Sequence, residues 1–245
     1  MKFVLALSIY LVSMGILPLT SEAYEVIDVK NGGAITGKIA FSGSPPAPAM
    51  HLITKDQSTC GKGKIEIREI DTKGGALRGV IVFLEKVKNG KAFSKAASHA
   101  VVDQKKCVFK PYLVVARNKS KLTIKNSDPV LHNIHAYELI GKLRRSMFNI
   151  AQPKSKPKTK KKLRTRRGGL VRFECDAHDW MLGFMYVAKN PYYAIVGADG
   201  SYSIGDIPPG NYTLNAWHPV LGVQKKQISV AAGGKASASF SFSKK

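Results

Sequence analysis

Short runs of alternating or β-branched residues, bounded by Gly, Pro and Asn, recur along the chain, and no stretch repeats apolar residues at helical spacing over three turns. Short strands at this spacing are typical of β-sandwiches and barrels. We therefore predict an all-β fold. The strands expected before the C-terminal region lie at residues 33–41, 80–84, 112–116, 121–125, 169–175 and 184–187.

The pattern changes near Tyr193. Tight-turn signals at Asp199-Gly200 and Pro208-Pro209-Gly210 separate alternating runs at 201–204 and 211–217, which predicts a small β-sandwich module over 191–245. The stretch AIVGADGSYSIGDIPPGNYTLNAW resembles carboxypeptidase regulatory-like modules. That resemblance implies a stabilising or docking module and transfers no catalytic group.

The N-terminus carries Lys2, an apolar run from Phe3 to about Leu19, and a small-x-small sequence that ends at Ala23. This pattern favours a cleaved signal peptide over residues 1–23, and a membrane anchor is the alternative. No later stretch reaches the roughly 18 apolar residues of a membrane span. We expect an exported protein, periplasmic or secreted, with an N-terminal β-region at 24–95 that completes one of the other β-domains.

The formal net charge of +23 is concentrated in one segment. Residues 142–167 hold twelve Lys or Arg and no acid. Like charges at this density repel one another, so a disordered or extended basic loop is expected there. One interpretation is that this segment is a solvated linker. The other is that it attracts an acidic redox partner or an anionic envelope surface. Nucleic acid is an unsuitable partner for an exported protein.

The segment from Cys175 to Met181 reads CDAHDWM and follows a predicted strand. It places a thiolate, an imidazole and a thioether at three-residue intervals. A thiolate with two imidazoles and a weak axial thioether is the ligand set of blue copper. The spacing alone has limited specificity, so a second imidazole is required, and His132 follows the strand that ends at Lys125.

These two segments resemble the cupredoxin family. The Pro-x-x-His-Asn run that ends at Asn133 and the short Cys-x-x-His-x-x-Met loop are similar to plastocyanin and especially to amicyanin. The likeness spans about residues 100–190 and implies a Greek-key β-sandwich domain at 96–190. Together with the C-terminal module, it resembles periplasmic plastocyanin-like proteins called methylamine utilisation proteins.

The resemblance implies one copper ion held by His132, Cys175, His178 and Met181. His132 would be buried, His178 would lie near the surface as the electron's exit, and Asn133 would tie the two ligand loops together. Trp180 and Leu182 beside His178 would form an apolar docking patch, and the alternative is that Trp180 packs against the C-terminal module. His135 is an additional candidate ligand and Met185 an alternative axial ligand, whereas surface or turn positions are expected for His51, His99 and His218.

The chain has three cysteines, and an odd count leaves one without a partner in an oxidising compartment. Once Cys175 is assigned to copper, Cys60 and Cys107 remain to form a disulfide, with separate free thiols as the alternative. Such a bridge would tie the N-terminal segment to the copper domain.

A four-ligand site without an open position favours one-electron transfer between redox partners over hydrolysis or oxygen activation. The sequence therefore predicts an electron carrier rather than an enzyme. Two other hypotheses remain open: a non-redox envelope module whose site captures copper or is vestigial, and a copper enzyme with an open site.

Overall fold

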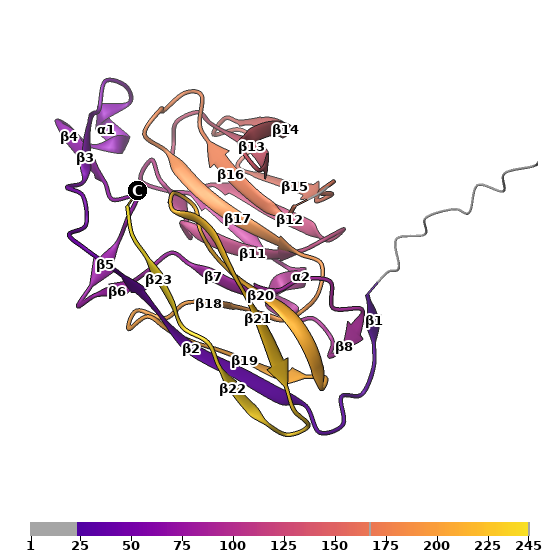
Figure 1. Cartoon of the computed structure of the whole chain (residues 1–245). Helices are drawn as coiled ribbons and strands as arrows, with labels where there is room; N and C mark the ends of the chain where they lie inside the picture. Colours follow the sequence, from indigo (N-terminus) through magenta and orange to yellow (C-terminus); the bar gives the residue numbers. More distant parts are fainter. Residues whose placement is uncertain (1–23, 167, 245) are drawn as a thin grey trace, which may run out of the picture.

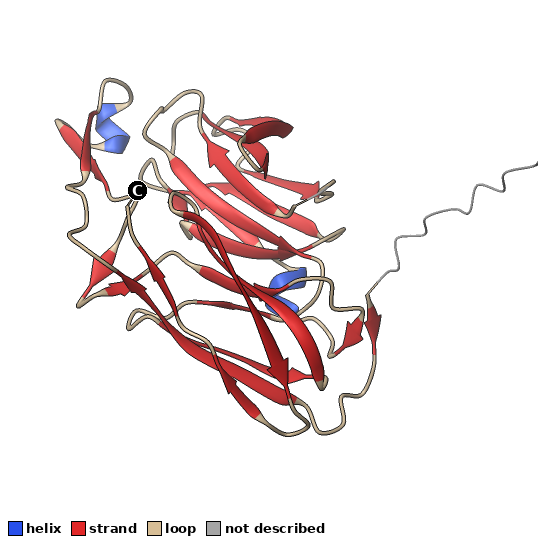
Figure 2. Cartoon of the chain, viewed as in Figure 1, coloured by secondary structure: helices blue, strands red, loops and turns tan. Residues whose placement is uncertain are grey.

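The computed structural model describes residues 24–166 and 168–244. The predicted signal peptide, residues 1–23, lies outside the described residues. Over these described residues the fold is all-β, as predicted, with two single-turn helices among the strands (Figure 2). Every strand predicted from alternation is present, with its ends shifted by at most a few residues.

The middle of the chain forms one sandwich, which we call the middle sandwich. One of its sheets has the order β10-β9-β12-β15 and the other β11-β17-β16-β13-β14. Figure 1 labels these strands from β11 to β17. Its strands are Val101–Gln104 (β9), Phe109–Lys110 (β10), Leu113–Arg117 (β11), Lys121–Asn126 (β12), His132–Ile140 (β13), Leu143–Gln152 (β14), Lys158–Lys162 (β15), Leu170–Glu174 (β16) and Leu182–Ala188 (β17).

The two ends of the chain together form a second sandwich, the terminal sandwich. Its sheets have the orders β18-β7-β20-β21 and β19-β2-β6-β5, and β22 and β23 also pair with β2. Its strands are Gly33–Phe41 (β2), Thr72–Lys73 (β5), Ala76–Leu77 (β6), Ile81–Leu84 (β7), Tyr193–Ile195 (β18), Ser201–Ile207 (β19), Gly210–His218 (β20), Gly222–Val230 (β21), Lys235–Ser237 (β22) and Phe240–Phe242 (β23).

Strands from the expected N-terminal region thus pair with strands of the expected C-terminal module: β2 pairs with β19, and β7 pairs with β18 and β20. These N-terminal strands therefore complete the C-terminal module, whereas Ile53 and the Cys60–Cys107 disulfide tie another part of the N-terminal region to the middle sandwich. The remaining elements are Glu25–Val26 (β1), Ala49–Leu52 (β3), Gln57–Cys60 (α1), Lys64–Ile67 (β4), Asn89–Gly90 (β8) and Lys95–Ser98 (α2).

An apolar layer joins the two sandwiches. Phe83 on β7 stacks on Tyr186 of β17 at 4.3 Å between ring centroids, and Trp217 of β20 meets the edge of Phe184. These side chains belong to one buried cluster formed by strands from both sandwiches. Each Å² of apolar surface removed from water stabilises the folded protein by roughly 25 cal/mol, so this shared layer couples the stability of the two cores. Within the described ranges, no helix is both long and apolar enough to cross a bilayer.

Most of the basic segment, as far as the structure describes it (142–166), is strand rather than loop, which corrects the sequence expectation. β14 pairs with β13, and β15 pairs with β12. Leu122 and Ile124 of β12 are buried in the core, whereas Lys158, Lys160 and Lys162 of β15 are exposed to solvent. Because side chains alternate along a strand, the backbone can pair while charges stay in water. The ladder therefore outweighs the repulsion between the cations.

Candidate metal centre

The loop between β16 and β17 carries three of the four predicted ligands. Two successive turns shape it: the amide of His178 donates to the carbonyl oxygen of Cys175 at 3.3 Å, and the amide of Met181 donates to that of His178 at 3.0 Å. These turns bring every third residue back toward the same side. The three-residue spacing of Cys175, His178 and Met181 is thus matched to the loop's geometry.

His132 is the first residue of β13, and a buried amide network fixes the turn before it. The Asn126 side chain donates to the carbonyl oxygens of Val130 and Gln152, both at 2.8 Å. These bonds hold the end of β12, the turn and the end of β14 together. His132 is thereby placed beside the loop that contains Cys175 although 43 residues separate them.

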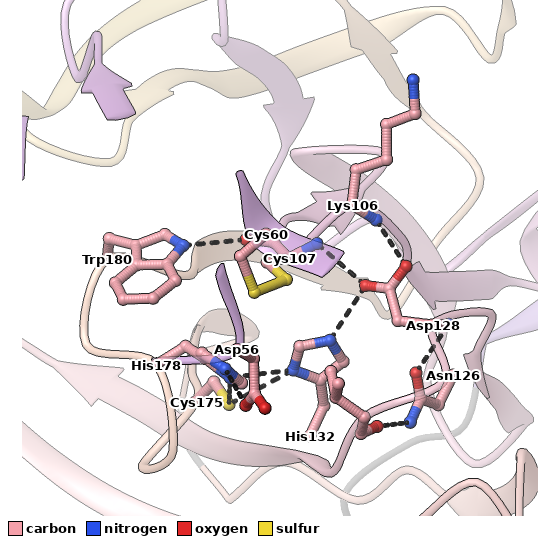
Figure 3. The surroundings of a disulfide bond; sticks show 11 residues. Asp56, Cys60, Lys106, Cys107, Asn126, Asp128, His132, Cys175, His178 and Trp180 are labelled. Atoms are coloured by element: carbon pink, nitrogen blue, oxygen red, sulfur yellow. Dashed lines mark hydrogen bonds and ion pairs between the residues drawn. A yellow bond between two sulfur atoms is a disulfide. The ribbon is translucent and has the colours of Figure 1, made fainter. Parts of the chain in front are cut away.

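His132, Cys175 and His178 converge on one point (Figure 3). The two Nδ1 atoms are 3.0 Å apart, and Sγ of Cys175 lies 4.0 Å from Nδ1 of His132 and 3.7 Å from Nδ1 of His178. A triangle with these sides has a single in-plane point about 2.1 Å from each corner, which matches the roughly 2.0–2.1 Å of zinc–imidazole bonds and is about 0.2 Å shorter than the roughly 2.3 Å of zinc–thiolate bonds. The three donors therefore fit a trigonal metal ion.

Burial of the site is nearly complete. His132 and His178 are 0% exposed, Met181 1% and Cys175 2%. The surface position expected for His178 is therefore wrong, because a segment described below covers the imidazole. Met181 packs in the same core cluster as Cys175. Its role as axial ligand stays a prediction.

The pKa of the Cys175 thiol is raised, because burial disfavours the thiolate, although the backbone amide of Asn133 counters this effect. That amide donates to Sγ at 3.5 Å. A buried thiol with a raised pKa needs a cation beside it before it is held as thiolate. Burial, followed by the neighbouring His132, lowers the pKa of His178. A lowered pKa keeps this imidazole neutral, the form that binds metals.

Each histidine has a carboxylate at the ring nitrogen that faces away from the triangle. Nε2 of His132 lies 2.9 Å from Oδ2 of Asp128, and Nε2 of His178 lies 3.0 Å from Oδ2 of Asp56. Burial opposes ionisation of Asp128, yet the amides of Cys107 and Lys106 that donate to it lower its pKa overall. A carboxylate on the second nitrogen fixes the tautomer and strengthens the imidazole as a ligand.

Asp56 and Asp128 were missed in the sequence. Asp128 stands four residues before His132, which is a usable signal once His132 is suspected. Asp56 precedes His178 by 122 residues, and no motif links them.

Asn133 joins the two ligand segments, as predicted. Its Oδ1 accepts from the amide of Asp176 at 2.7 Å, and its Nδ2 donates to the Asp176 carboxylate at 2.9 Å. His135 lies three residues after His132 and thus on the opposite face of β13. It contacts Asp176 and Ser146 rather than the triangle. Met185 is 0% exposed on β17 and packs in the core.

The predicted disulfide is present between Cys60 and Cys107, and Cys175 is free. Trp180 lies beneath this bridge: it is 2% exposed, its Nε1 donates to the Cys107 carbonyl at 3.1 Å, and its ring meets that of His178 edge-on at 5.0 Å. Trp180 therefore supports the site from inside. Neither the docking patch nor the contact with the C-terminal module was correct for this residue.

One family model matches the chain: polysaccharide lyase family 4, domain II, over residues 176–238. This match runs from the ligand loop into the terminal sandwich and covers about a quarter of the chain. No curated protein matches. The resemblance of the C-terminal stretch to carboxypeptidase regulatory-like modules, and that of the whole to methylamine utilisation proteins, stay predictions.

Solved structures similar to this chain include cupredoxins. A purple cupredoxin from Nitrosopumilus maritimus is 17% identical (TM-score 0.31) over 36% of this chain and 99% of its own. Plastocyanin from Dryopteris crassirhizoma is 20% identical (TM-score 0.31) over 36% of this chain and 100% of its own. A reduced Cu(I) amicyanin mutant is 17% identical (TM-score 0.31) over 44% and 98%. Similarity at this level does not indicate a function.

Proposed function

We propose that this protein holds one copper ion on His132, Cys175 and His178, with Met181 as a weak axial ligand, and carries single electrons between redox partners. The observation that carries the proposal is the triangle of two Nδ1 atoms and one Sγ around a point about 2.1 Å from each. One thiolate and two imidazoles in a plane are the donors of blue-copper centres. When bound, copper supplies a one-electron couple between its Cu(I) and Cu(II) states.

The surrounding residues keep the donor geometry fixed. The Asn133 amide donates to Sγ of Cys175, and its side-chain oxygen accepts from the amide of the next residue of the loop, so β13 and the ligand loop are tied together. Asp128 orients His132. A donor set that does not rearrange between two oxidation states keeps the reorganisation cost of electron transfer small, which supports a carrier role.

Burial favours a carrier over an enzyme. All four proposed ligands are at most 2% exposed, so a substrate has no route to them in this conformation. Electrons can pass through the protein atoms around a buried site, whereas a substrate or a water molecule cannot reach the ligands through them. The same burial also supports a second candidate function, copper capture without electron transfer, because a sealed site retains its ion.

Redox kinetics separate these two functions. The copper-loaded protein is reduced and reoxidised with small-molecule redox agents in a stopped-flow instrument, and its midpoint potential is measured. The carrier proposal expects full, repeated cycling without loss of copper. Copper that is bound one-to-one but fails to cycle, or leaves on reduction, would favour capture.

A cationic face is the proposed contact for an anionic partner, protein or envelope surface. Lys121 of β12 lies directly opposite Lys162 of β15, and Lys125 lies opposite Lys158. All four are exposed, and Lys160 stands between them. Like charges facing each other across strands are unfavourable in the free protein, so an anionic partner that neutralises them gains free energy. Asp103 on β9 is the acid beside Lys125.

An exported location is part of the proposal. It is supported by the Cys60–Cys107 disulfide, because such bridges persist in oxidising compartments.

A further inference from the structure

A segment remote in sequence from the ligands covers the metal centre. Residues 53–63, which we call the cap, contain α1 and connect β3 to β4; this hairpin stands beside the middle sandwich (Figure 1). The cap is anchored twice. Ile53 is 3% exposed within the core of the middle sandwich, and Cys60 is bonded to Cys107.

Asp56 is the residue through which the cap meets the proposed ligands. It stands at the N-cap of α1, where an Asp side chain normally accepts from an amide of the first turn. The Asp56 side chain makes no such bond, and its backbone is left-handed with φ of 49°. Its carboxylate instead lies 3.0 Å from Nε2 of His178 (Figure 3). The left-handed conformation is unfavourable for a residue with a Cβ, so the fold maintains this orientation at a cost.

We propose that Asp56 is a positioning residue of the metal centre, delivered by the disulfide-anchored cap; this inference rests on the proposed copper site. Asp56 accepts a hydrogen bond from the Nε2–H of His178, which leaves the Nδ1 lone pair directed at the other two donors. Its negative charge makes the imidazole a stronger ligand. The cap also closes the centre, so metal enters and leaves only when the cap opens.

The two carboxylates differ in what holds them. Asp128 belongs to the segment that carries His132, and it is fixed by the amides of Lys106 and Cys107. Asp56, by contrast, belongs to the cap, which the Cys60–Cys107 disulfide attaches to the middle sandwich. The strength of one ligand therefore depends on the cap's anchorage, and Asp56, whose side chain is 41% exposed, is the more exposed of the two carboxylates that contact the histidines.

The first test compares two aspartates that both have a positive φ. Asp56→Gly removes the side chain at a φ that suits glycine. Asp206→Gly is the matched control, because Asp206 also has a positive φ, 56°, and its side chain is 76% exposed and bonded to Lys91. Cu(II) affinity of the full-length mature protein is measured by competition with a chelator of known affinity. We expect Asp56→Gly to bind 10- to 100-fold more weakly and Asp206→Gly to match wild type.

Asp56→Asn refines this test, because an amide oxygen still accepts from Nε2 but carries no charge, and an affinity between wild type and Asp56→Gly is expected. Equal affinities for Asp56→Gly and Asp206→Gly, with circular dichroism showing both folded, would overturn the inference. If wild type itself binds no copper, both the inference and the proposed function fail. If wild type binds copper with a thiolate charge-transfer band and Asp56→Gly binds equally well, the inference alone fails.

A second test asks whether the cap acts through Asp56. The double variant Cys60→Ala/Cys107→Ala frees the cap but keeps Asp56. We expect a chelator to remove copper at least tenfold faster than from wild type. Adding Asp56→Gly to this variant should weaken copper affinity little further, because opening the bridge and removing the side chain both abolish the same contact, that of Asp56 with His178. Fully additive losses in affinity would show that cap and Asp56 act independently, contrary to the proposal.

Discussion

The stability of the terminal sandwich should depend on pH through His218. A surface or turn position was expected for this residue, and it is 2% exposed at the end of β20, directly before a turn. Its Nδ1 accepts from the amides of Val220 and Leu221, both at 3.2 Å, so protonation of Nδ1 would break two hydrogen bonds and bury a charge. Burial lowers the pKa of His218 from the usual 6.5 to about 4.

Because the folded pKa is the lower one, the unfolded chain binds the proton first as pH falls. The stabilising contribution is complete above pH 6.5, declines below it, and is lost by about pH 4. The shift corresponds to about 3 kcal/mol of unfolding free energy over this window.

Urea unfolding of the metal-free protein at pH 7, 5.5 and 4 measures this contribution. His218→Asn replaces the acceptor with one that does not titrate, and His99→Asn, at an exposed site, is the control. Carboxylates titrate in all three proteins, so the difference between variant and wild type isolates His218. The variant should lose about 3 kcal/mol less than wild type between pH 7 and 4. Parallel pH profiles for wild type and His218→Asn would refute the reasoning.

Three further predictions concern the bridge, the interface and the cationic face. Replacing both Cys60 and Cys107 with Ala opens a loop of 47 residues and should lower the unfolding free energy by about 4 kcal/mol in urea titrations; an unchanged midpoint would contradict this. Phe83→Ala removes the ring stacked on Tyr186 and should cost about 3 kcal/mol in the same assay, with Val223→Ala at an exposed site as control. Changing Lys158, Lys160 and Lys162 to Gln should slow association with anionic vesicles or an acidic redox partner about tenfold at low salt, with the difference shrinking near physiological salt; equal rates at low salt would leave the face without this role.

The strands and the three converging donors could be predicted because their signals are local. Alternation identifies β2 and β20 without knowledge of their partners. The three-residue spacing of the ligands is matched by hydrogen-bonded turns within the ligand loop itself, so it can be recognised without knowledge of distant contacts. His132 could be added because it follows a strand and precedes Asn133, in a pattern that resembles a known family.

Features that depend on distant contacts were missed. Nothing near Asp56 indicates that it meets His178, although the predicted bridge at Cys60, four residues later, could have placed it near Cys107. The buried state of His178 follows from the same contact. The strand at Lys158–Lys162 was missed because charge repulsion was weighed without the ladder that β12 offers. Burial of His218 depends on the strand pairing of both chain ends, which single-residue signals do not reveal.

The measurement that tests the copper centre most directly is the visible absorption spectrum of the protein loaded with one equivalent of Cu(II), recorded beside that of Cys175→Ser. The account predicts an intense thiolate-to-copper charge-transfer band in wild type and its loss in the variant, because a hydroxyl cannot replace the soft thiolate ligand. Met181→Leu should keep the band and shift the reduction potential. A wild-type spectrum without the band, or a band that persists in Cys175→Ser, would contradict the account.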